Sequence, residues 1–549
     1  MSRETRTARS SILILLFILL SLSTRAQAPS SASAPAVSKV WVADRGDGSY
    51  QNPIIHADYS DPDVIRVGED FYMTASSFNA SPGLPVLHSK DLVNWSLIGY
   101  ALARQPPFDV YSRPQHGNGV WAPSIRYHNG EFYIYYPDPD YGIYMVKARN
   151  PAGPWSEPLL IKEAKGWIDP CPLWDTDGNA YLVSAMAASR SGIKSILIVS
   201  RMTSDGTRLL DEGVMVFDGH DKHPTLEGPK FYKRNGYYYI FAPAGGVSMG
   251  WQLALRSKNV YGPYEGRVVL AQGKTTINGP HQGAWVDTQT GEDWFIHFQD
   301  KGAYGRVVHL QPMKWINDWP SIGIDADGDG TGEPVLTYKK PNVGKRWPIQ
   351  TPADSDEFNA AGLGLQWQWQ ANRQPNWAFP TGSFGFLRLF NVPLPEGSNF
   401  WDVPNLLLQK FPAPEFTATT KLTFTARTDD EETGLVVMGL DYAYVSVKKR
   451  PEGLVVYETI VKDAEKGGKV KESRGALLSS NTFYLRVKVS KTATCNFSYS
   501  TDGVSFSTIG EPFTAREGKW IGAKVGLFAV RRGKTRETGY ADFDWFRVE

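Results

Sequence analysis

The chain has 549 residues, which is long enough for two or three domains. Its 58 lysines and arginines nearly balance its 57 aspartates and glutamates, so its charge gives no reason to expect a nucleic acid or another polyanion as partner. Aromatic side chains make up 13% of the residues and long helical patterns are few, which favours an all-β fold.

The first 28 residues have the features of a signal peptide. Three arginines precede a short apolar run at 12–20, and the sequence Ala-Gln-Ala at 26–28 is typical of a cleavage site. The apolar run is too short for a comfortable membrane span, so no stable membrane insertion is expected after cleavage; an uncleaved anchor is the alternative. Residues 29–38 form a Pro/Ser/Ala linker. The mature protein is predicted to be exported, to the periplasm or out of the cell.

A repeat organises residues 39–340. Each unit has a proline, a short strand, a Gly/Asp/Asn turn and an aromatic strand, as in the run from His56 to Phe78. The prolines that open the units are Pro62, Pro123, Pro170, Pro229 and Pro280. Strand hairpins that recur at intervals of about 50 residues are typical of a β-propeller, so the sequence predicts five blades around one channel.

Three of the five units begin with an acidic residue: Asp61, Asp169 and Glu227. The inner strands of a propeller line its channel, so these carboxyls are expected to meet at one end, where their repulsion is costly unless they have a function. Glycoside hydrolysis uses two carboxyls on opposite sides of the scissile bond, and a third can raise the pKa of the proton donor. The alternative is that each motif is only a turn. Strand alternation points Asp63 away from Asp61, and Asp58 is interpreted as a turn residue.

Four segments of this domain resemble those of glycoside hydrolase family 43, and they lie at residues 58–78, 166–185, 226–246 and 304–315. That family contains five-bladed propellers that act as β-xylosidases, α-L-arabinofuranosidases and arabinanases, with inversion at the anomeric carbon. The resemblance implies that Asp61 is the general base, that Asp169 tunes the pKa of the acid and orients it, and that Glu227 is the general acid. Inversion would separate the Asp61 and Glu227 carboxyls by about 6.5–9.5 Å.

The same resemblance implies four further site residues. Phe78 and Trp121 match walls of the sugar pocket, and Arg306 matches an arginine that hydrogen-bonds sugar hydroxyls. His281 matches a channel histidine that often lies near a water-bound calcium. Each has a structural alternative: a core aromatic ring, an ion pair within a blade, or a channel histidine without metal. The resemblance implies no required cofactor and leaves a structural calcium open.

After a linker at 341–352, residues 353–549 lack the blade pattern. Short alternating strands separated by turns predict a β-sandwich. Its first and last segments resemble the concanavalin-like, jelly-roll domain that follows the propeller in many family 43 xylosidases. The sandwich either binds sugar itself or packs on the propeller and closes one end of the pocket. The two cysteines, Cys171 and Cys495, are predicted to be reduced and buried rather than bridged.

Two places in the sequence are candidates for a structural calcium. One is in the sandwich, where Asp356 or Asp544 could be a ligand. The other is the acidic run at 325–330, whose alternating aspartates resemble the start of a calcium loop. Leu336 stands where such a loop requires a bidentate glutamate, which favours a solvated turn there.

The sequence therefore predicts an all-β enzyme, a five-bladed propeller followed by a sandwich. Its expected activity is exo-acting, inverting removal of terminal α-L-arabinofuranosyl or β-D-xylosyl residues from plant cell-wall polysaccharides or oligosaccharides. Two alternatives remain: an endo-arabinanase and a non-catalytic carbohydrate-binding propeller. The sequence does not choose between arabinose and xylose, because pocket shape discriminates between such similar sugars by only about 1–3 kcal/mol.

Overall fold

The computed structural model describes residue 1 and residues 37–394, 399–533 and 537–549. Contacts within the chain divide it into two units, residues 1–35 and 36–549, and the second contains all the elements below. The predicted signal peptide, apart from Met1, and most of the linker lie outside the described residues. Across the described ranges, no helix is long and apolar enough to cross a membrane.

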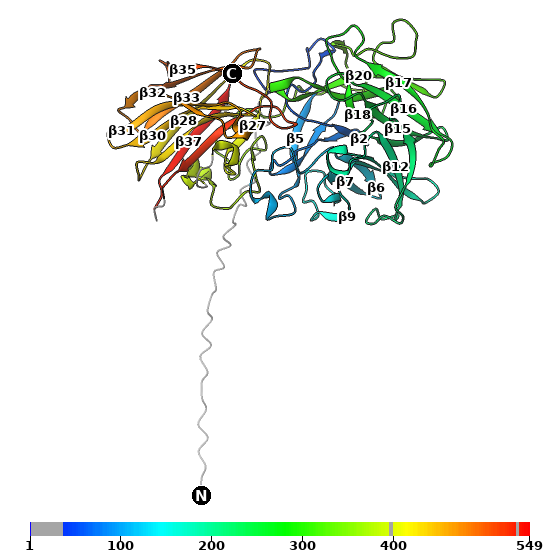
Figure 1. Cartoon of the computed structure of the whole chain (residues 1–549), viewed down its shortest axis with the longest axis horizontal. Coiled ribbons are helices and arrows are strands. Elements are labelled where there is room, and N and C mark those ends of the chain that lie inside the picture. The colour runs from blue at the N-terminus through cyan, green and yellow to red at the C-terminus, as the bar shows by residue number, and fades with distance from the viewer. Residues whose placement is uncertain (2–36, 395–398, 534–536) are drawn as a thin grey trace. The chain divides into compact units, whose positions relative to one another are not determined.

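Residues 63–322, all of which the structure describes, form five four-stranded antiparallel sheets (Figure 1). The blades are, in chain order: β2 (Asp63–Val67), β3 (Asp70–Thr74), β4 (Gly83–Ser89) and β5 (Trp95–Leu102); β6 (Ser124–His128), β7 (Glu131–Asp138), β8 (Gly142–Ala148) and β9 (Leu159–Glu163); β10 (Trp167–Trp174), β11 (Ala180–Met186), β12 (Ile196–Met202) and β13 (Val214–Asp218); β14 (Lys230–Arg234), β15 (Tyr237–Ala244), β16 (Trp251–Ser257) and β17 (Glu265–Ala271); β18 (His281–Asp287), β19 (Asp293–Asp300), β20 (Arg306–Ile316) and β21 (Trp319–Ile322). The predicted propeller is confirmed.

The blades are held together by apolar side chains that fill the space between neighbouring sheets. Ile125 of the second blade packs with Val86 of the first, and Phe241 of the fourth packs with Phe295 of the fifth. Because blades stack face to face, both faces of their middle strands are buried, and every residue of β11 is buried. Cys171 lies in one of these clusters; it is free and buried, as is Cys495, as predicted.

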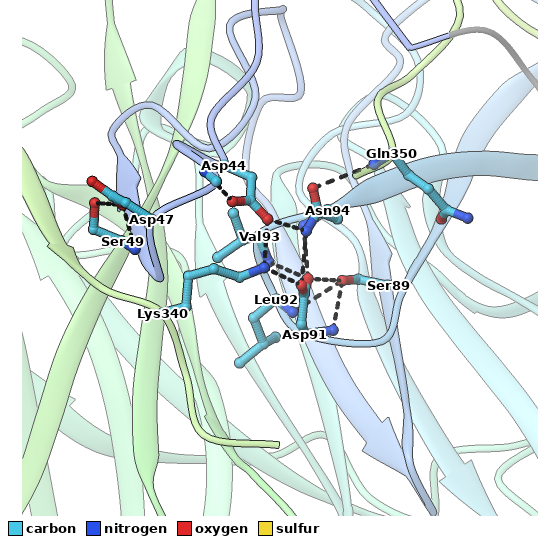
Figure 2. Close-up of polar contacts among 11 residues, drawn as sticks. Asp44, Asp47, Ser49, Ser89, Asp91, Leu92, Val93, Asn94, Lys340 and Gln350 are labelled. Carbon is cyan, nitrogen blue, oxygen red and sulfur yellow. Dashed lines mark hydrogen bonds and ion pairs between the residues drawn. The ribbon is translucent and has the colours of Figure 1, made fainter. Parts of the chain in front are cut away.

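The ends of the propeller segment are tied together outside the blades. Strand β1 (Ser49–Gln51) pairs antiparallel with β22 (Thr337–Lys339). Just after β22, the Lys340 ammonium lies 2.5 Å from Asp44 Oδ2 and 2.8 Å from Asp91 Oδ2, and Asn94 Nδ2 donates to both carboxylates (Figure 2). A buried ionic cluster thus joins the first blade to the chain that leaves the last one.

The C-terminal domain is a sandwich of two sheets, as predicted. In the described part of the chain, one sheet has the order β23 (Gln368–Trp369), β27 (Leu407–Lys410), β36 (Lys524–Arg531), β29 (Glu431–Met438), β30 (Tyr442–Arg450), β31 (Gly453–Val461) and β32 (Val470–Leu478), with β26 (Val392–Pro393) pairing β36. The other has the order β24 (Ala378–Pro380), β25 (Leu387–Phe390), β37 (Tyr540–Val548), β28 (Phe416–Thr425), β33 (Thr482–Val489), β34 (Thr494–Ser500) and β35 (Ser507–Thr514). Helices in the described ranges are single turns: α1 (Ala188–Ser191), η1 (Val110–Ser112), η2 (Gly302–Tyr304), η3 (Gly382–Phe384), η4 (Phe400–Asp402) and η5 (Ala464–Lys466).

The two calcium candidates of the sandwich have other partners. The Asp356 carboxylate accepts hydrogen bonds from the Phe358 and Gly364 amides and from the Trp367 indole. Asp544 forms an ion pair with Lys421 at 2.7 Å. Both aspartates therefore have protein partners, and a calcium-binding role for either stays a prediction.

Candidate active site

The predicted site residues gather around one pocket of about 470 Å³ at the end of the channel where the inner strands begin. Its walls are formed by Asp61, Phe78, Trp121, Ala122, Ile168, Asp169, Glu227, Val247, Gln282, Arg306 and Trp520. Six of the seven residues proposed from the sequence are in this set, and the seventh, His281, contacts one of them.

Asp61 is held by donors from two sides. Ser60 Oγ and Ser76 Oγ donate to its Oδ2 at 2.7 and 2.5 Å, and Arg306 Nη1 lies 3.4 Å from Oδ1. Asp61 and Asp169 precede or begin inner strands of their blades, and both have a φ of 56°, a left-handed conformation that costs energy for a non-glycine residue. A shared strained backbone at both acids is what a functional constraint produces.

Glu227 has a different neighbour. His281 Nε2 lies 2.9 Å from Glu227 Oε1, and the histidine is fully buried at the start of β18. Among the described residues, the acidic grouping with metal-binding spacing is Asp325, Asp327 and Asp329, not a set around His281. His281 is therefore placed as a hydrogen-bond partner of Glu227, and its position near a water-bound calcium stays a prediction.

Asp169 is buried beside Glu227. Its Oδ2 accepts from the Gly228 amide at 2.7 Å and from Gln282 Nε2 at 3.4 Å. Burial, together with repulsion from the nearby Glu227 carboxylate, raises the pKa of Asp169 well above its usual range. Gly228 has a φ of 59°, and a Cβ there would approach the Gln282 side chain to 2.8 Å, so this turn requires glycine.

Arg306, Phe78 and Trp121 form walls around the carboxyls. Arg306 Nη1 donates to Ser60 Oγ at 2.7 Å, so the guanidinium lies beside Asp61. The Trp121 indole donates to the Gly117 carbonyl at 2.9 Å, which fixes the ring plane. The structural alternatives for these residues do not exclude a site role, because all three side chains line the pocket.

Sequence reasoning missed five residues of this pocket, of which Gln282 and Trp520 are the two that are not aliphatic. Trp520 comes from the sandwich, where no periodicity connects it with the blades; its ring centroid lies 6.4 Å from that of Trp121. Gln282 had a weak signal, since it directly follows His281 at the start of the fifth inner strand. A register shift between His281 and Gly283, with a φ of 36° at Gln282, brings both consecutive side chains to the carboxyls.

The two aspartates that flank Asp61 have separate roles. Asp63 points away, as strand alternation predicts, and forms an ion pair with Arg126 at 2.7 Å. Asp58 is more than a turn residue: its Oδ1 accepts from the Arg306 amide at 2.9 Å and its Oδ2 from the Gly522 amide at 3.1 Å. The interpretation of Asp58 as a local turn was wrong, because its partners are far away in the sequence.

Three carboxyls lie in one pocket, Asp61 beside hydroxyls and an arginine and the other two beside each other, and aromatic rings form its walls. This arrangement is the one expected of a carbohydrate-active hydrolase. Residues 50–320 match the Glycosyl hydrolases family 43, and residues 355–549 match the Beta xylosidase C-terminal Concanavalin A-like domain. The chain is 43% identical over 501 residues to a protein of Xylanibacter ruminicola that carries beta-xylosidase in its name, covering 90% of this chain and 88% of that protein.

Two further comparisons agree. The chain is 30% identical over 537 residues to the Non-reducing end alpha-L-arabinofuranosidase BoGH43B of Bacteroides ovatus, covering 92% and 96% of the two chains. The solved structure of Bacteroides ovatus Xyloglucan PUL GH43B is similar with a TM-score of 0.79, 28% identity and coverage of 91% and 99%. The chain belongs to glycosyl hydrolase family 43 and is a glycoside hydrolase of the xylosidase and arabinofuranosidase type.

Proposed function

We propose that this enzyme removes terminal α-L-arabinofuranosyl or β-D-xylosyl residues from plant cell-wall polysaccharides or oligosaccharides by inverting, single-displacement hydrolysis. One observation carries the proposal: Asp61 and Glu227 line the same pocket in unlike surroundings. Asp61 faces two hydroxyls and a guanidinium, whereas Glu227 faces His281 and the carboxyl of Asp169. Pairs of carboxyls in contrasting environments are typical of an acid and a base.

In the proposed mechanism, Asp61 takes a proton from a water molecule as its oxygen attacks the anomeric carbon. Glu227 gives its proton to the glycosidic oxygen as the bond between that oxygen and the anomeric carbon breaks. Burial and repulsion from the Glu227 carboxylate raise the pKa of Asp169, so the two carboxyls interact directly, as the tuning role proposed for Asp169 requires. The acid would then regain its proton, and the base lose its own, through solvent.

The walls support recognition of one terminal sugar. Arg306 presents a guanidinium beside Asp61, where a sugar hydroxyl can accept from it. The rings of Phe78, Trp121 and Trp520 offer apolar faces for the C–H groups of the sugar. A wall supplied by the sandwich favours exo action over the open groove that an endo-arabinanase needs.

The identity of the sugar, the stereochemistry and export are parts of the proposal that experiment decides. The names of the relatives include both sugars, since one relative is named for β-xylose and another for α-L-arabinofuranose. The signal peptide predicted at 1–28 supports a periplasmic or secreted enzyme.

The test is a set of initial rates on nitrophenyl α-L-arabinofuranoside and nitrophenyl β-D-xylopyranoside, with NMR of the first-formed anomer. Asp61→Asn is expected to lower kcat about 10²–10⁴-fold, the range for loss of a general base. Asp221→Asn, in an exposed turn, is the matched control and should keep wild-type rates. A first-formed sugar with retained configuration would contradict the mechanism, and sugar binding without hydrolysis would favour the non-catalytic alternative.

A further inference from the structure

Two hydrogen bonds join the sandwich to the propeller beside the pocket. The Gly522 amide donates to Asp58 Oδ2 at 3.1 Å, and the Ala523 amide donates to the Ala303 carbonyl at 2.7 Å. Asp58 is 4% exposed, so these bonds form away from water. Buried hydrogen bonds to a charged oxygen are stronger than neutral ones, and their loss leaves an unsatisfied group.

The same carboxylate also fixes a residue of the pocket. Asp58 Oδ1 accepts from the backbone amide of Arg306 at 2.9 Å. The packing here has no spare room, since a Cβ on Gly305 would come within 2.6 Å of Asp58 and a Cβ on Gly522 within 2.7 Å of the Gly305 nitrogen. Asp58 therefore joins the start of β20 and the sandwich loop through its two oxygens.

The sandwich loop needs this anchor because it carries Trp520 in an unfavourable position. Trp520 has a φ of 64°, and 51% of the residue is exposed. Its ring is a wall of the catalytic pocket and also of a neighbouring cavity of about 800 Å³, which Arg306 lines as well. A half-exposed ring with a strained backbone is held by its loop rather than by its own burial.

The charges around Asp58 support its role as an anchor. Lys410 and Lys524 are directly opposite each other on β27 and β36. Burial and repulsion from Lys410 lower the pKa of Lys524 to about 7, and the negative charge of Asp58 opposes that shift. A neutral residue at position 58 would remove an anion that offsets these two cations.

We propose that Asp58 is a positioning residue that holds the Trp520 loop and Arg306 in place, so that substrate affinity in the propeller depends on the docked sandwich. This inference rests on the proposed function, because it assumes that the pocket binds the sugar to be cleaved. Asp58 itself does not line the pocket and acts through Trp520 and the backbone of Arg306.

Steady-state kinetics on the nitrophenyl glycoside that is hydrolysed faster distinguish an effect on the Trp520 loop from an effect on the reacting carboxyls. Gly522→Ala introduces close contacts with the backbone of Tyr304 and Gly305 but no φ strain, because Gly522 does not have a positive φ. It should raise KM about tenfold, the loss of about one aromatic contact, with kcat within about threefold of wild type. Trp520→Ala should do the same, and Asp58→Asn should raise KM at least as much.

A double-mutant cycle decides whether the anchor acts through the ring. If it does, Gly522→Ala in the Trp520→Ala background should raise KM by less than about twofold, because the contact that it disturbs is already gone. Multiplication of the two effects would overturn the proposal, as would an unchanged KM in Gly522→Ala. Gly362→Ala is the matched control, since a Cβ at Gly362 meets nothing within 4 Å.

Asp61→Asn, measured in parallel, keeps the two failures distinct. If Asp61→Asn retains activity, the proposed catalytic roles fail, whatever the double-mutant cycle shows about Asp58. If Asp61→Asn is inactive while Gly522→Ala and Asp58→Asn have wild-type KM, the positioning role of Asp58 alone is refuted. Urea unfolding of each variant distinguishes a poorly folded protein from a changed pocket.

Discussion

Replacing Lys340 with methionine would leave two buried carboxylates without the cation that they share. In the native protein, Lys340 lies within ion-pair distance of Asp44 and Asp91 at the point where the chain leaves the propeller (Figure 2). Methionine keeps most of the length and apolar surface of the side chain, so Lys340→Met mainly removes the charge. The side chain of Asp91 is 2% exposed, so water cannot replace the lost ammonium there.

The expected cost follows from the partners that remain. Removing one member of a buried ion pair costs about 3–5 kcal/mol, because the other charge stays desolvated. Asp91 keeps the amides of Val93 and Asn94, and Asp44 keeps the Asn94 side chain. These donors place the loss at the lower end, at about 3 kcal/mol.

Urea unfolding followed by tryptophan fluorescence measures this loss at pH 7. Lys339→Met is the matched control: the Lys339 side chain is 67% exposed and its ammonium lies 3.5 Å from Glu292, so its removal should cost less than about 1 kcal/mol. Lys340 helps to lower the pKa of Asp44 in the native state, so the deficit of Lys340→Met should shrink as pH falls and the carboxylates are protonated. A loss below about 1 kcal/mol at pH 7 would refute the view that this cluster closes the propeller.

Three further predictions concern the pocket and its surroundings. Lys524→Met should stabilise the protein most at pH 7 and below, where the buried ammonium is charged. The pKa of Lys524 is about 7 in the fold and about 10.4 in unfolded chains. The unfolding curves of variant and wild type should therefore converge by about pH 10. His281→Phe removes the partner of Glu227 and should lower kcat about 10–100-fold on xylo- or arabino-oligosaccharides but less on nitrophenyl glycosides, whose leaving group needs little acid help; equal losses on both would contradict this role. Gly228→Ala forces a Cβ against Gln282 and should lower kcat/KM at least about tenfold without loss of the β-sheet circular dichroism signal.

The sequence was sufficient for the propeller and its three acids because both follow from a repeat. Pro62, Pro170 and Pro229 open their repeat units, so the acidic residues that shortly precede or adjoin them lie at the same end of the channel. A local repeat of this kind predicts the fold correctly, because each blade is built from strands that are neighbours in the chain. The structure accordingly brings Asp61, Asp169 and Glu227 into one pocket.

The rest of the site depends on contacts that no local pattern encodes. Asp58 and Gly522 are 464 residues apart, and nothing in either segment indicates the other. Trp520 lies in a turn of the sandwich that resembles any other aromatic turn. His281 was found by its motif, but the motif does not show that the ring contacts the Glu227 carboxyl, because these two residues are far apart in the sequence.

The wall that the sandwich supplies also affects when the enzyme becomes complete during its synthesis. Glu227 and Trp520 are separated by about 300 residues, which a ribosome adds in about 15–60 s at 5–20 residues per second. During that interval a nascent propeller can already have its acids but not the ring that faces them. A chain interrupted before Trp520 would therefore have all three carboxyls and a pocket without that ring, so the proposed role of the loop makes full substrate affinity depend on the finished chain.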